Sequence, residues 1–421
     1  MPDYPFRSEA EFAGILKEYI RPAQPIDTPE LLQGRDQVLR DLGRTLHSPG
    51  MHVFVYGERG VGKTSIALTA AKTFAKADAP YVGCDENSTF SGIVTDICNE
   101  LLGQRYLKSG KELSGTAGFN IGILKAEGKV GGQNIFVVPE NITSVNHAAN
   151  LIIESTQKRG VGEHAIVIDE LDRIQSKDVT SQLAELIKLL HDKRPPLRFV
   201  MCGIGKTLDE IIGSHLSASR PITGFELPLI SFDARWKIIT NAAEKLGMEV
   251  PKEFLVRISQ ISDGFPYYVH LIAENLFWQI FDHREMSREA SSNDFHAAIG
   301  RAIERAEAPL REAYNFAIQK TTNSADYEEA LWATAHLTHF ERQLKDIYER
   351  SYLPVMEYRK PRVPIPIAKF RTRLYSLCSA GHGNILERKR NSWYSFGENV
   401  VRGYVRLVAE RNKVPLGSDH F

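Results

Sequence analysis

The sequence predicts an α/β fold: a mostly parallel sheet covered by helices on both faces, followed by a helical lid and a C-terminal winged helix. Three observations support this prediction. A short apolar run at 53–56 leads through a glycine-rich loop into an Ala- and Leu-rich helix. Four more apolar runs alternate with helical stretches, as the strands of a parallel sheet do. From residue 232 to about 308 the pattern is helical, without strand runs.

Composition and length are those of a soluble globular protein. The 421 residues are 43% hydrophobic and 25% charged, enough chain for two to four packed units. No apolar run reaches the ~18 residues that a membrane span needs, and the N-terminus lacks the apolar core of a signal peptide. We therefore expect a cytoplasmic protein without a membrane partner. Free thiols are expected rather than a disulfide framework or a zinc site, because paired spacing is absent from Cys84, Cys98, Cys202 and Cys378.

The order of patterns along the chain indicates four parts. Residues 1–30 form an N-terminal arm, 31–230 the α/β base, 231–308 the helical lid and 309–421 the winged-helix domain. In the base we expect a first helix at 31–46, an inserted hairpin at 118–130, and strands at 53–56, 80–83, 165–168, 199–202 and 224–227.

The glycine-rich loop has the full spacing of a phosphate-binding loop, between a strand and a helix. Its glycines let backbone N–H groups wrap around phosphate oxygens, and the helix that follows points its positive end at the same anion. Lys63 is expected to reach the β and γ phosphates, and the Thr64 hydroxyl to bind Mg²⁺. The sequence therefore predicts an ATP and Mg²⁺ site whose nucleotide ligands are Gly57, Glu58, Arg59, Gly60, Val61, Gly62, Lys63, Thr64 and Ser65.

A second glycine-containing run, 203–207, also follows a strand and ends in Lys206-Thr207. Val200 stands where its first glycine should be, so the complete loop cannot form. We do not expect a second phosphate site there.

Two acids, Asp169 and Glu170, follow the apolar run 165–168. The carboxyl edge of a parallel sheet is where ligands bind, and these acids come 105 residues after the phosphate loop. Asp169 is expected to hold the Mg²⁺ shell and Glu170 to polarise the attacking water. The alternative is two acids at an ordinary strand end.

These motifs, with residues 32–35 ahead of the first strand, resemble the AAA+ ATPases. More narrowly, they resemble the initiator group (Orc1/Cdc6-like) and the neighbouring STAND-type NTPases. The resemblance covers about residues 30–305, and more loosely the C-terminal module. It implies that Arg35 lies near the adenine, that Lys206 or Thr207 serves as a γ-phosphate sensor, and that Arg220 is an arginine finger acting across a homo-oligomer interface. The alternative for Arg220 is a surface arginine.

The lid departs from the initiator pattern. No arginine occurs in 263–271, where initiators carry a second sensor, and Gly264-Phe265-Pro266 is more similar to STAND proteins. This departure argues against rapid hydrolysis and is consistent with a nucleotide-gated switch. His270, in the same stretch, is expected to be a packed core histidine.

The C-terminal region predicts a winged helix that binds DNA. Between 359 and 413 there are thirteen Lys and Arg residues against three Glu, a local net charge of +10 in a chain of net charge zero. Helices are expected at 327–337 and 342–350. A third, 367–377, buries residues 367, 370, 374 and 377, and a hairpin wing follows at 385–396. The expected DNA contacts are Lys369, Thr372 and Arg373 on the helix and Arg388, Lys389 and Arg390 on the wing. The alternative is a winged helix used for protein contacts.

Taken together, the sequence predicts an ATP-hydrolysing protein whose nucleotide state controls oligomerisation and DNA or partner binding. The catalytic residues would be Lys63, Glu170 and Arg220. One alternative is a STAND-like switch, in the manner of bacterial defence proteins, that activates an unidentified protein partner. Another is a scaffold that holds nucleotide without turnover.

Overall fold

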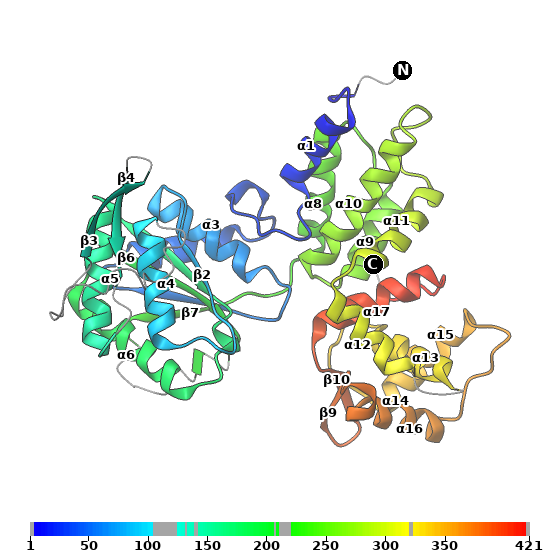
Figure 1. Ribbon diagram of the computed structural model, residues 1–421. Coiled ribbons are helices and arrows are strands. Elements are labelled where there is room, and N and C mark those ends of the chain that lie inside the picture. The colour runs from blue at the N-terminus through cyan, green and yellow to red at the C-terminus, as the bar shows by residue number, and fades with distance from the viewer. Residues whose placement is uncertain are drawn as a thin grey trace. The chain divides into compact units, whose positions relative to one another are not determined.

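The computed structural model describes residues 4–103, 124–130, 133–138, 142–205, 208–209, 220–319 and 323–417. The chain divides into two compact units (Figure 1). The base unit consists of Ile26–Gly57 and Lys63–Leu227, and the C-terminal unit consists of Met1–Pro25, Glu58–Gly62 and Pro228–Phe421.

The base unit is built on a five-stranded parallel sheet in the order β2-β5-β6-β1-β7. Each strand lies within two residues of its predicted position, so the predicted sheet is confirmed. Its strands are β1 (His52–Tyr56), β2 (Tyr81–Gly83), β5 (His164–Asp169), β6 (Leu197–Gly203) and β7 (Ile222–Glu226).

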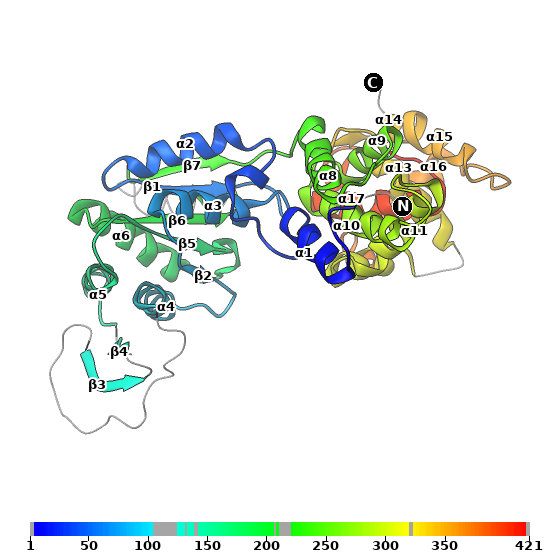
Figure 2. The ribbon, with the colours of Figure 1, turned by 90° about the horizontal axis from the view of Figure 1, so that it is seen from above.

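Helices cover both faces of this sheet, because successive strand residues point to opposite sides. Phe199 and Met201 of β6 lie in a core cluster with α4, α5 and α6, whereas Val200 is fully buried outside that cluster. Helix α3 packs against β5 and β6 and next to α2. Figure 2 shows these layers. The helices are α2 (Asp36–His47), α3 (Lys63–Ala75), α4 (Phe90–Leu102), α5 (Val145–Arg159) and α6 (Lys177–Lys193).

Two local details of the base differ from the prediction. The first helix begins at Asp36 rather than at residue 31, because Gly34 takes a left-handed conformation (φ 73°) after the short 3-10 turn η1 (Pro29–Leu31). The hairpin expected at 118–130 lies farther along the chain, as antiparallel β3 (Leu124–Val130) and β4 (Gln133–Val137). Residues 118–123 of the predicted hairpin lie outside the described chain.

The first half of the C-terminal unit is helical. The arm helix α1 packs on α8, and an aromatic cluster of Phe12, Trp278 and Phe281 joins α1 to α10. The helices are α1 (Glu9–Tyr19), α8 (Phe232–Leu246), α9 (Lys252–Ser262), α10 (Pro266–Asp282), α11 (Ser292–Arg305) and α12 (Ala308–Ile318).

The second half of this unit contains a small three-stranded sheet, ordered β8-β10-β9. Its elements are α13 (Ser324–Ala335), β8 (Arg342–Gln343), α14 (Leu344–Ile347), the π-turn η4 (Tyr348–Tyr352), α15 (Leu353–Glu357), α16 (Ile367–Leu377), β9 (Leu386–Arg390), β10 (Trp393–Phe396) and α17 (Asn399–Arg411). Helix α17 contacts α9, α11, α12 and α13 and so joins the two halves.

Two predictions in this half are wrong. The helix expected from 342 starts two residues later, because Arg342 and Gln343 pair with β10 as a strand. Ile367 is 37% exposed, whereas Phe370, Leu374 and Leu377 are buried as expected. Position 367 is the first residue of α16, where no neighbouring turn covers it. In the part of the chain that the structure describes, no helix is long and apolar enough to cross a membrane.

Candidate functional site

The backbone conformation of the phosphate loop requires glycine at three positions. Gly57, Gly60 and Gly62 have φ values of 153°, 81° and 94°, a region that side chains disfavour. A Cβ on Gly57 would also lie 2.6 Å from the carbonyl oxygen of Leu227. The loop between β1 and α3 thus depends on glycine at these positions.

Two side chains of the loop are engaged inside the C-terminal unit. Arg59 forms ion pairs with Glu307 (3.3 Å) and Glu398 (3.4 Å), and Glu58 accepts a hydrogen bond from Asn399 (2.9 Å). Val61 is buried, with 1% of its surface exposed. In this loop, backbone N–H groups therefore remain the main means of contacting an anion.

The first residues of α3 connect the loop to the rest of the base. Lys63 Nζ donates to the carbonyl oxygen of Gly57 (3.0 Å), and Thr64 Oγ1 donates to Asp169 Oδ2 (2.5 Å). Ser65 Oγ accepts from the backbone N–H of Ile26 (3.0 Å), so this hydroxyl holds the connector of the N-terminal arm. The predicted site residues Lys63, Thr64 and Asp169 are thus brought together.

Asp169 is buried at the carboxyl end of β5, with 3% of its surface exposed. Its Oδ1 accepts from the backbone N–H of Glu170 (2.8 Å), and its Oδ2 receives the Thr64 hydroxyl. A hydroxyl and a carboxylate side by side are the hard oxygen ligands that Mg²⁺ prefers, with phosphates and water completing its shell. Among the described residues no group of three His, Cys, Asp or Glu side chains could hold a metal by itself. Thr64 and Asp169 therefore fit a cation shared with phosphate.

Glu170 stands in a left-handed conformation (φ 57°), directly after β5. Its carboxylate receives Arg173 Nη1 at 3.0 Å, and about half of each side chain is exposed. This ion pair raises the pKa of Arg173. A glutamate acting as a base toward water would have to exchange this partner.

The sequence reasoning missed two residues around Asp169. Tyr81, the first residue of β2, donates its hydroxyl to Asp169 Oδ2 (3.4 Å), and burial followed by the charge of Asp169 raises its pKa. Cys202, fully buried at the end of β6, lies 3.7 Å from the carbonyl oxygen of Lys63, and burial raises its pKa well above the usual range. A tyrosine two positions before Gly83 on the strand next to β5 was the available signal for the first contact.

The remaining nucleotide-site predictions are Arg35, Arg220, Lys206 and Thr207. Arg35 is buried at the start of α2, and burial lowers its pKa to about 10. Arg220 is exposed in the turn before β7. Because β7 runs parallel to β1, Arg220 is at the sheet edge opposite the phosphate loop. Lys206 and Thr207 lie outside the described residues.

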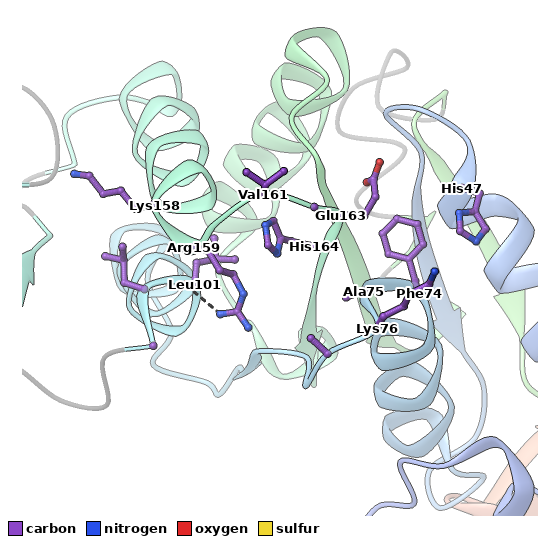
Figure 3. A pocket seen from close by; sticks show the side chains of 14 residues that line it. His47, Phe74, Ala75, Lys76, Leu101, Lys158, Arg159, Val161, Glu163 and His164 are labelled. Carbon is purple, nitrogen blue, oxygen red and sulfur yellow. Dashed lines mark hydrogen bonds between the residues drawn. The ribbon is translucent and has the colours of Figure 1, made fainter. Parts of the chain in front are cut away.

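A cavity of about 740 Å³ opens at that opposite edge of the base sheet (Figure 3). The carboxyl ends of α3, α4 and α5 line it, and no phosphate-loop residue does. Arg159 donates there to the carbonyl oxygens of Glu100 (3.1 Å) and Leu101 (3.0 Å), which closes the end of α4. The most basic residue of the cavity thus has a structural function.

The predicted DNA contacts fall into two groups. Lys369, Thr372, Arg388, Lys389 and Arg390 are exposed. Arg388 stacks on the ring of Tyr375, which is itself 47% exposed. The wing cations also have acidic neighbours, since Lys389 pairs with Glu387 and Arg390 lies 3.4 Å from Glu341.

Arg373 differs from that group. Its side chain is 19% exposed, pairs with Asp326 (3.1 Å) on α13 and lies over the ring of Tyr327. Asp326 also pairs with Arg362, and the fully buried Glu329 pairs with Arg359 and Arg362. The positive charge counted between 359 and 413 is therefore partly neutralised by acids on α13.

A buried ionic cluster lies between the carboxyl end of α9 and α17. Asp263 (φ 51°) forms ion pairs with Arg402 (3.3 Å) and Arg406 (2.9 Å) of α17, and both arginines are almost fully buried. His270, 3% exposed, accepts the backbone N–H of Arg21 at Nδ1 (3.3 Å), and burial lowers its pKa to about 4. The prediction of a packed core histidine is confirmed.

Comparison with known proteins identifies the domain that carries the phosphate loop. Residues 31–200 match the family model described as "AAA ATPase domain". This part of the chain is similar to AAA ATPase domains, which bind nucleotides, and it contains the phosphate loop, Asp169 and Glu170. No curated protein matched the sequence.

Three solved structures are similar to this chain at low sequence identity. The Walker-type ATPase PABY2304 of Pyrococcus abyssi is 17% identical, covers 91% of this chain and 99% of its own, and gives a TM-score of 0.51. Cdc6p of Pyrobaculum aerophilum is 16% identical over 96% of this chain and 98% of its own (TM-score 0.45). The Aeropyrum pernix ORC1 protein, solved in complex with DNA, is 14% identical over 91% and 95% (TM-score 0.44). At 17% identity, the similarity to PABY2304 extends to the fold alone.

Proposed function

We propose that this chain is a Mg²⁺-dependent ATPase whose nucleotide state controls self-association and the binding of DNA by its C-terminal half. The observation that carries the proposal is the 2.5 Å contact between Thr64 Oγ1 and Asp169 Oδ2. This contact joins the phosphate loop to the acid pair across 105 residues of sequence. This contact argues against the alternative of two acids at an ordinary strand end, because such acids would not be expected to contact the first turn of a phosphate-binding helix.

Each predicted site residue of the AAA-like domain has a role in this proposal. Backbone N–H groups of the loop bind the triphosphate, and Lys63 exchanges the Gly57 carbonyl for the β and γ phosphates. Thr64 and Asp169 would hold Mg²⁺, which neutralises charge on the phosphates. Glu170 leaves Arg173 and orients the attacking water. Arg220 of another subunit supplies positive charge to the transferred phosphoryl group.

The order of elements after α12 supports a winged helix. Helix α13, strand β8, helices α14 to α16 and the β9–β10 hairpin follow one another, and the three strands form one sheet. In such a domain α16 enters the major groove and the hairpin contacts the backbone. We propose Lys369 and Thr372 for the groove, and Arg388, Lys389 and Arg390 for phosphates.

A second candidate function is a nucleotide-gated switch with slow turnover that activates a protein partner. The ion pair between Glu170 and Arg173 favours it, since the base is restrained before a nucleotide binds. The lid segment 263–271, which contains no arginine, is a further argument for the switch. Under this reading DNA has no effect on turnover.

The test of the proposal is Glu170→Gln. Replacing the carboxylate removes the general base but keeps the side-chain volume, so steady-state hydrolysis should fall about 10²-fold to 10³-fold with ATP affinity retained. Lys63→Ala is the control, because it should lose nucleotide binding as well. Unchanged turnover in Glu170→Gln removes Glu170 from the mechanism. Turnover stimulated by DNA favours the ATPase over the switch.

A further inference from the structure

The phenol of Tyr81 is a second hydroxyl on the carboxylate of Asp169. Strand β2 is the edge strand of the base sheet and lies beside β5 (Figure 2). Tyr81 Oη donates to Asp169 Oδ2 at 3.4 Å, and Thr64 Oγ1 donates to the same oxygen at 2.5 Å. Both carboxylate oxygens are therefore held, since Oδ1 accepts the backbone N–H of Glu170.

The register of the sheet explains how the ring reaches this oxygen. Tyr81 pairs with Val167 and Gly83 with Asp169, so Tyr81 and Gly83 point to the same face. The ring leans along β2 over Gly83, where an added Cβ would lie 3.5 Å from Cε1 and 3.6 Å from the hydroxyl oxygen. A methyl group fits at those distances, but a branched side chain at residue 83 would displace the ring.

We propose that Tyr81 is a positioning residue for the divalent cation of the AAA domain. Its phenol fixes the rotamer of Asp169 so that Oδ2 stays against Thr64, and the two cation ligands are aligned before the cation binds. This inference depends on the proposed Mg²⁺-dependent nucleotide function. Partners that orient a metal ligand typically change metal affinity about 10-fold to 100-fold when removed.

The experiment measures cation affinity directly. Mn²⁺ binding to the full-length chain with ADP, followed by electron paramagnetic resonance, should weaken about 10-fold in Tyr81→Phe. ADP affinity in EDTA should remain at the wild-type value, because the phenol contacts only the carboxylate among the cation ligands. The Mg²⁺ concentration for half-maximal hydrolysis should rise by the same factor, and kcat at saturating Mg²⁺ should stay within about twofold.

Gly83 offers a matched pair of variants that leave Tyr81 in place. Gly83→Val should reproduce the loss of Mn²⁺ affinity by moving the ring, whereas Gly83→Ala should bind Mn²⁺ as wild type does. Wild-type Mn²⁺ affinity in a folded Tyr81→Phe overturns the inference. So does an equal loss of ADP affinity in EDTA, which would indicate general damage. If wild type binds Mn²⁺ and ADP without hydrolysing ATP, the proposed ATPase activity fails while the Mn²⁺ data still decide the role of Tyr81.

Discussion

Two groups of cations in the C-terminal unit have opposite surroundings. Arg402 and Arg406 of α17 are almost fully buried, where they pair with Asp263 and donate to carbonyl oxygens at the end of α13. The wing cations 388–390 are exposed. The first group stabilises the interior of the unit, whereas the second is accessible to a ligand. Because both groups have acidic neighbours, burial is what separates their roles, and the burying residues come from distant parts of the chain.

The largest effect is expected at the buried group. Asp263→Ala leaves two buried guanidinium groups without their carboxylate, which should lower the free energy of unfolding of the C-terminal unit by about 3–5 kcal/mol. Urea titration followed by circular dichroism measures this change. Glu387→Ala, which removes an exposed partner of Lys389, is the control and should change stability by less than about 0.5 kcal/mol. Equal effects of the two variants would abolish the distinction.

Burial also predicts a pH dependence in the same unit. Because the pKa of His270 falls to about 4, the unfolded chain takes up this proton below pH 6.5 while the folded chain does not. Stability is thus unaffected above pH 6.5 and is lost as pH falls from 6.5 to 4, by about 3 kcal/mol in total. His270→Phe should remove this part of the acid sensitivity in urea titrations at pH 7 and pH 4.5. The same slope in the variant would contradict the assignment.

The exposed group should be detected through salt. Reversing the charges of Arg388, Lys389 and Arg390 should reduce the slope of log affinity against log salt by about 3, because each lost phosphate contact removes about one counterion release. Fluorescence anisotropy with duplex DNA between 50 and 200 mM salt measures the slope. A wild-type chain without salt-dependent DNA binding would end the DNA part of the proposed function.

The smallest effect separates two cations on one helix. Lys369→Ala should lower the same slope by about 1, whereas Arg373→Ala should leave it unchanged, because Asp326 already neutralises Arg373. Arg373→Ala should instead reduce stability, since it leaves a mostly buried carboxylate with one partner fewer. An equal loss of slope in both variants would restore Arg373 as a DNA contact.

The sequence was most informative where local patterns determine structure. The phosphate loop and the strand before Asp169 are continuous motifs, and parallel strands bring their carboxyl ends to one edge, so the neighbourhood of Thr64 and Asp169 followed directly. Short apolar runs fixed the five strands to within two residues, because a strand buried on both faces has few polar positions.

The parts that could not be predicted depend on partners far along the chain. The pairing of Arg373 with Asp326 spans 47 residues, and the contact of Tyr81 with Asp169 spans 88. A charge count over 359–413 excludes the acids of α13 and therefore overestimated the free positive charge. Strand β8 is only two residues long and exists through its pairing with β10, which no local pattern records.

Helix α17 has a mechanical consequence for any motion of the lid. It packs against α9, α11, α12 and α13, and Arg406 donates to the carbonyl oxygens of both Gln260 and Ala335. These contacts join the helices before and after the predicted boundary near residue 308. A nucleotide that turns α9 and α10 would turn the β9–β10 hairpin through the same angle. A small rotation near the lid would therefore produce a larger displacement at the hairpin tip.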